Sequence, residues 1–116
     1  MVAPRWRSPR LGLAGTLTIL ALSISGSAQA PDPQQLFREA FEAQQRGDSA
    51  LAVRKYGELL QLRPDMFEAR ANLGGALVAR GRFDEAIGQY SAALPYAPDN
   101  HALHVGLAFA YYRPQW

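Results

Sequence analysis

The chain has 116 residues, which allows one small domain, and its 12 basic and 10 acidic side chains give a formal net charge of +2. It contains no cysteine. Disulfides, thiol catalysis, zinc–thiolate sites and a cysteine-linked lipid are therefore excluded, and the fold must rest on apolar packing.

The first thirty residues have the three-part order of a secretory signal peptide. Three arginines and no acid stand in MVAPRWRSPR, an uncharged apolar stretch runs from Leu11 to about Ile24, and the small-residue tail SGSAQA follows. We expect cleavage after Ala28, which leaves a signal peptide of residues 1–28 and an exported domain of residues 29–116. The predicted location is periplasmic or secreted.

An uncleaved membrane anchor is the alternative for the same segment. The uncharged run from Leu11 to Pro31 has 21 residues, close to the ~20 that a helix needs to cross a bilayer. In both cases the arginines stay inside and the domain lies outside the cytoplasm, so the membrane is contacted only through the N-terminal segment.

The positive charge belongs to this N-terminal segment. Without Arg5, Arg7 and Arg10, nine basic side chains remain against ten acidic ones, for a net charge of −1. The exported part therefore shows no excess of positive charge, and we expect no nucleic-acid partner.

The rest of the chain repeats with a period of 34 residues, as a comparison of residues 33–66 with 67–100 shows. Gly47 and Gly81 stand where one helix must end and the next begin, and glycine readily adopts the left-handed turn conformation. The seven identities fall where a helical hairpin needs particular residue types: Arg46/Arg80, Gly47/Gly81, Ala52/Ala86, Tyr56/Tyr90, Leu60/Leu94, Pro64/Pro98 and Asp65/Asp99.

The apolar spacing and the turn residues predict five helices joined by short turns. Ser49 and the pair Asp84-Glu85 stand at the starts of two of these helices and are interpreted as capping residues rather than catalytic ones. Short connections favour antiparallel neighbours stacked in order. The predicted helices cover residues 33–46, 49–62, 67–80, 83–96 and 101–113.

The second repeat, FEARANLGGALVARGRFDEAIGQYSAALPYAPDN, resembles the tetratricopeptide repeat (TPR) family. Its signature places are filled by Leu73-Gly74, Leu77, Gly81, Phe83, Ala86, Tyr90, Ala93, Leu94 and Pro98. The first repeat is looser, with Leu36, Ala40 and Ala43 replacing the usual tryptophan, glycine and tyrosine. A partial third copy, residues 101–116, is in register until Pro114.

The resemblance implies an all-α fold, a right-handed superhelical α-solenoid of antiparallel helix hairpins with about two and a half TPR repeats. It also implies a non-enzymatic scaffold that binds a protein or peptide and needs no cofactor. In such proteins the first helix of each hairpin lines a concave groove. Carried over by position, the groove residues are Phe37, Arg38, Phe41, Gln44, Gln45, Asn72, Val105, Phe109 and Tyr112, flanked by Gln34, Glu68, Ala71, Gly75, Val78, Ala79 and Arg113.

Two groove assignments have open alternatives. The amide of Asn72 is suited to pairing with a ligand backbone, or it is an ordinary surface residue of the repeat. Phe37 and Phe41, one helical turn apart, are either ligand anchors or core residues. They occupy places where some TPR proteins hold a C-terminal carboxylate with lysine and asparagine, which argues against carboxylate capture here.

No catalytic or metal site is expected. His101 and His104 lie three residues apart and are able to share a metal ion, but a full ligand set is missing. No nucleophile–base arrangement, phosphate-binding loop or paired carboxylate stands out.

The last predicted helix is apolar nearly all round, which is unusual for the end of a repeat array. Three explanations stay open: a longer repeat array with further hairpins, which we favour from the sequence, self-association through this face, or coverage by Pro114-Gln115-Trp116. The sequence thus predicts an exported binding module. The alternative is a structural or oligomerisation segment of a larger envelope protein, and nothing visible supports an enzyme.

Overall fold

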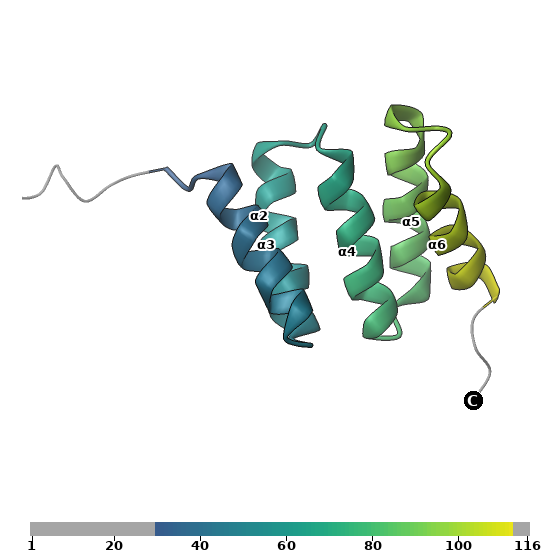
Figure 1. Ribbon diagram of the computed structural model, residues 1–116, viewed down its shortest axis with the longest axis horizontal. Helices are drawn as coiled ribbons and strands as arrows, with labels where there is room; N and C mark the ends of the chain where they lie inside the picture. The colour runs from purple at the N-terminus through teal and green to yellow at the C-terminus, as the bar shows by residue number, and fades with distance from the viewer. Residues whose placement is uncertain (1–29, 113–116) are drawn as a thin grey trace, which may run out of the picture. The chain divides into compact units, whose positions relative to one another are not determined.

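A computed structural model describes residues 30–112, which contain five α-helices, one short 3₁₀-helix and no strand (Figure 1). Residues from Pro31 onward form a compact unit of their own. The predicted all-α hairpin fold is confirmed, and each helix lies within a few residues of its predicted range. The elements are α2 (Pro33–Gln45), α3 (Ser49–Leu62), α4 (Phe67–Ala79), α5 (Phe83–Ala93), η2 (Leu94–Tyr96) and α6 (His101–Tyr112).

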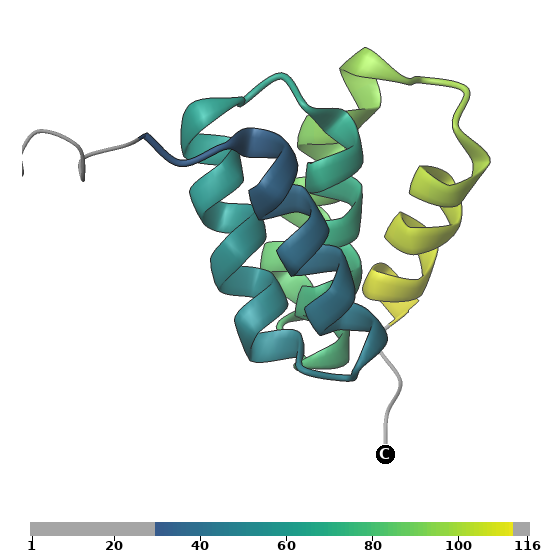
Figure 2. The ribbon, with the colours of Figure 1, turned by 60° about the vertical axis from the view of Figure 1, so that its left-hand side comes forward.

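The helices stack in sequence order. The helices α2 and α3 form one antiparallel pair and α4 and α5 the next, while α6 packs against α5 as the first helix of a third pair (Figure 2). The helices α2 and α4 also touch, as do α4 and α6. The first helices of the three units therefore lie side by side, as the helices that line a groove must.

In the described range no helix has the length and apolarity needed to cross a bilayer. The predicted signal peptide or anchor lies outside the described residues.

The two hairpin turns are closed in the same way. Gly47 and Gly81 have φ values of +81° and +74°, a conformation that costs glycine little and other residues more. Each glycine follows the last turn of a helix, and the residue after it donates a hydrogen bond back into that turn, from Asp48 N to Ala43 O at 2.8 Å and from Arg82 N to Leu77 O at 2.9 Å. This is the Schellman arrangement, and it confirms the predicted role of both glycines.

The start of α3 differs from the prediction. Asp48, not Ser49, is the N-cap, because its carboxylate accepts a hydrogen bond from Leu51 N at 3.1 Å while Ser49 is the first helical residue. Asp84 and Glu85 do lie in the first turn of α5, but that helix has no side-chain cap. Glu85 instead pairs with Arg82 at 2.7 Å.

The end of α5 also departs from the predicted range of 83–96. The α-helix stops at Ala93 and the chain continues as a 3₁₀ turn to Tyr96. Pro95 causes this change, because it has no N–H to extend the α-helical hydrogen-bond ladder.

Small residues and tyrosines dominate the core. Eight alanines are completely buried, and the largest fully buried side chains are Tyr56, Leu59 and Leu103. The ring of Tyr90 lies between Gly74 on α4 and Gly106 on α6, so closely that a Cβ atom on either glycine would stand within 2.7 Å of the ring. One aromatic ring therefore fixes the spacing of three helices.

Candidate peptide-binding groove

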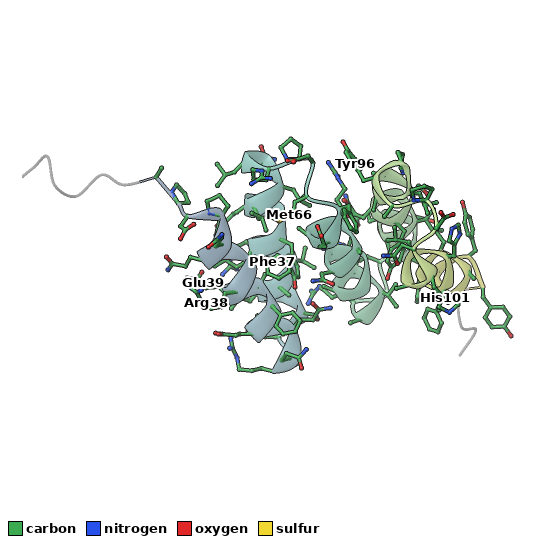
Figure 3. All side chains as sticks on the ribbon, turned by 45° about the horizontal axis from the view of Figure 1, so that its top comes forward. Phe37, Arg38, Glu39, Met66, Tyr96 and His101 are labelled. Carbon is green, nitrogen blue, oxygen red and sulfur yellow. The ribbon has the colours of Figure 1, made fainter. Side chains whose placement is uncertain are left out.

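A hollow lies between the N-terminal parts of α2 and α4. It has a volume of about 360 Å³ and is lined by Gln34, Phe37, Met66 and Glu68. Figure 3 shows Phe37 and Met66 near one another on the side of α2 that faces α4. The hollow thus combines an aromatic ring and a thioether with one amide and one carboxylate.

The two phenylalanines of α2 have different surroundings. Their rings stack with centroids 6.5 Å apart, and the ring of Phe37 meets Tyr56 edge-on at 5.8 Å. Phe37 is partly buried against the core, whereas Phe41 is 45% exposed. The core therefore holds the ring of Phe37 in place, and the stacked ring of Phe41 continues this apolar surface toward solvent.

Gln44 and Asn72 belong to a hydrogen-bond network between α2, α3 and α4. The buried phenol of Tyr56 donates to Gln44 Oε1 at 3.1 Å, and Gln44 Nε2 donates to the backbone oxygen of Asn72 at 3.5 Å. Burial raises the pKa of Tyr56, and a hydrogen bond with the Asn72 side chain opposes that rise. Both amides thus have partners inside the protein.

This network bears on the alternatives for Asn72. The residue is half-buried and joins two neighbouring hairpins through Tyr56. The described structure therefore gives its side chain an internal partner.

Arg38 and Gln45 are exposed and do not line the hollow. Figure 3 shows Arg38 with Glu39 at the edge of α2 that is remote from α4. Glu39 pairs there with Lys55 of α3 at 3.0 Å.

The three predicted groove residues of α6 do not line the hollow either. Val105, Phe109 and Tyr112 are exposed by 52%, 47% and 78%. They form an apolar stripe on α6 at helical spacing, separate from the hollow between α2 and α4.

Met66 is the lining residue that the sequence analysis missed. It directly precedes α4, which has no side-chain cap. One repeat later the same place holds Asn100, whose side chain accepts a hydrogen bond from Leu103 N at 3.2 Å and caps α6. The next repeat has a capping asparagine at this place. A methionine here therefore indicates a role other than capping, and this was the signal that could have identified Met66.

The paired histidines of α6 form no metal site with other described residues. His104 Nε2 lies 2.7 Å from the backbone oxygen of Pro98. Within residues 30–112 there is no group of three or more histidine, cysteine, aspartate or glutamate side chains placed to hold a metal ion.

The stacked hairpins, the closely spaced first helices and the hollow between them define a helical-repeat protein with a groove. A family model of the tetratricopeptide repeat matches residues 37–101, more than half of the chain. The chain belongs to the tetratricopeptide repeat family, which generally comprises non-enzymatic scaffolds for protein–protein interaction. No curated protein matches the chain.

Proposed function

We propose that this chain is an exported scaffold that binds an extended segment or an amphipathic helix of a partner protein between α2 and α4. The hollow lined by Gln34, Phe37, Met66 and Glu68 is the observation that carries the proposal. Peptide-binding grooves are mostly apolar and contain a few polar groups that fix the orientation of the ligand. This hollow has that composition.

The lining also suggests what the ligand looks like. The ring of Phe37 and the thioether of Met66 suit an apolar anchor side chain, and methionine adapts to anchors of different shape. Glu68 is exposed at the rim, where a carboxylate favours a ligand with a lysine or arginine beside the anchor. The proposed ligand is therefore a segment with an apolar anchor and a basic neighbour.

Selection of a displayed library of random peptides on residues 31–116 tests the proposal. We expect the selected peptides to share an apolar residue next to a basic one. Met66→Ala and Glu68→Gln, which both change residues that line the hollow, should each weaken binding about tenfold, equivalent to ~1.4 kcal/mol, with unchanged helicity by circular dichroism. Leu62→Ala is the matched control, since Leu62 is an exposed apolar residue of α3 outside the hollow.

Binding that survives both groove substitutions would refute the groove. It would favour the alternative function, in which the repeats serve as a structural segment of a larger envelope assembly and contact partners through other faces.

The export part of the proposal rests on the order of charged, apolar and small residues before Pro31. A reporter enzyme that is active only outside the cytoplasm, fused after residue 30, should be active. Replacing Arg5, Arg7 and Arg10 by glutamate should abolish that activity. N-terminal sequencing of the intact protein then separates cleavage after Ala28 from an uncleaved anchor.

A further inference from the structure

The exposed surface of α6 is apolar where the corresponding surface of α4 is covered. Tyr111 occupies the place that Leu77 has one repeat earlier, yet Tyr111 is 65% exposed and Leu77 only 3%. Gly74 on α4 is buried against Tyr90 of α5, while the corresponding Ala108 is exposed. In α4 this face is covered by the following helix, α5.

We propose that a second copy of this chain covers this face, so that two α6 helices pair antiparallel about a two-fold axis at Ala108. Val105, Ala108 and Tyr112 share one stripe of α6 at helical spacing. The small side chain of Ala108 lets two helix backbones approach closely, and an antiparallel pair centred on Ala108 places Val105 of one copy opposite Tyr111 of the other.

The lack of formally charged side chains on α6 permits a partner identical to itself. Side chains next to a two-fold axis lie near their own copies, so a charge close to Ala108 would repel itself. Residues 101–112 contain no aspartate, glutamate, lysine or arginine. The two histidines lie within the first four residues of the helix, away from the axis, and His104 is bonded to Pro98.

The opposite end of the stack does not suit the same face. There Gln35 donates to Glu39 at 2.9 Å, and Glu39 pairs with Lys55 at 3.0 Å. Covering these groups with the apolar surface of α6 would remove their water without offering them hydrogen bonds. Head-to-tail stacking is therefore disfavoured, and a closed pair through two α6 helices is favoured.

The available area fits a weak dimer. If a whole aromatic side chain presents roughly 200 Å², the exposed parts of Phe109, Tyr111 and Tyr112 offer about 400 Å² per copy. With Val105 and Ala108, two copies would bury at most about 1,000 Å², the smallest area expected of a specific interface. The pairing removes Val105 and Tyr112 from any groove, but it leaves the hollow between α2 and α4 open.

The absence of cysteine from the chain makes single-cysteine cross-linking a direct test in residues 31–116. Ala108→Cys should form a disulfide-linked dimer under mild oxidation at least tenfold faster than Gln35→Cys, which places an exposed cysteine on the polar end of the stack. Two α6 helices crossing at residue 108 bring the Cα atoms within the range that a disulfide spans.

Sedimentation equilibrium supplies the second measurement. The unmodified fragment should pass from monomer to dimer with increasing concentration, and Val105→Glu should weaken the dimer at least tenfold at unchanged helicity. Equal cross-linking rates at positions 108 and 35, growth beyond a dimer, or a monomer at all accessible concentrations would each overturn the pairing. None of these outcomes depends on peptide binding at the hollow.

Discussion

Gly106 gives the sharpest test of the packing, because the ring of Tyr90 leaves no room beside it. A Cβ atom at position 106 would lie 2.6 Å from Cζ and 2.8 Å from Cε1 of Tyr90. The ring has little room to move away from α6, because it also lies close to the backbone of Gly74, where an added Cβ would stand only 2.7 Å from it. We predict that Gly106→Ala destabilises the protein although alanine is the better helix former.

The magnitude follows from two opposing terms. Alanine in place of glycine within a helix stabilises by about 0.5–1 kcal/mol, and overpacking a tightly filled core costs about 1–3 kcal/mol. Gly88→Ala is the matched control, because Gly88 lies inside α5 with nothing within 4 Å of an added Cβ. The free energies of unfolding of the two variants should therefore differ by about 1–3 kcal/mol, the cost of overpacking. Gly88→Ala should stabilise the protein, and Gly106→Ala should destabilise it wherever that cost exceeds the gain from alanine.

Thermal unfolding of residues 31–116, followed by circular dichroism, is the assay. At roughly 4–8 °C per kcal/mol for a domain of this size, Gly88→Ala should melt at least ~4 °C above Gly106→Ala. In a Tyr90→Leu background the ring is gone, and Gly106→Ala should no longer destabilise. Equal melting temperatures for the two alanine variants, or the same penalty without the ring, would refute the reasoning.

Three further predictions concern single contacts. Asp48→Ala should cost about 1 kcal/mol in urea unfolding, since it removes the N-cap of α3, whereas Ser49→Ala should be nearly neutral. Tyr56→Phe should cost about 1 kcal/mol in the same assay, because the half-buried amide oxygen of Gln44 loses its donor. Hydrogen bonds from Gln35 and then Lys55 lower the pKa of Glu39, so its contribution to stability is complete above the pKa of the unfolded chain and is lost as pH falls through the folded pKa. Glu39→Gln should therefore flatten the decline in melting temperature below about pH 4.5.

Local signals in the sequence were sufficient for the fold. Gly47 and Gly81 marked both hairpin turns, and their positive φ values show why glycine stands there. The prediction failed where two neighbouring residues compete for one role: Asp48 and Ser49 are both good N-caps, and only the path of the backbone decides between them. Pro95 indicates that α5 ends early, but the predicted range of 83–96 follows the 34-residue repeat and extends past this proline.

The groove was less predictable than the fold. Position within the repeat correctly placed Phe37 at the hollow. It does not reveal which side chains form hydrogen bonds with the neighbouring hairpin. Gln44 meets Tyr56 twelve residues later in the chain, and Asn72 meets the same tyrosine from the next hairpin. Such contacts depend on how the hairpins pack against one another, which the repeat pattern alone does not specify.

Tyr56 and Tyr90 hold the same place in the repeat but face different neighbours. Tyr56 donates a hydrogen bond to Gln44 and has the Asn72 side chain beside it, whereas the ring of Tyr90 needs bare backbone at Gly106. A duplicated second hairpin, inserted after residue 100, would bring Asn72 of the new copy against Tyr90 of the old one, where no side chain fits. The hairpins of this chain are thus not interchangeable parts, and lengthening the array by duplication would require Asn72→Gly in the added copy.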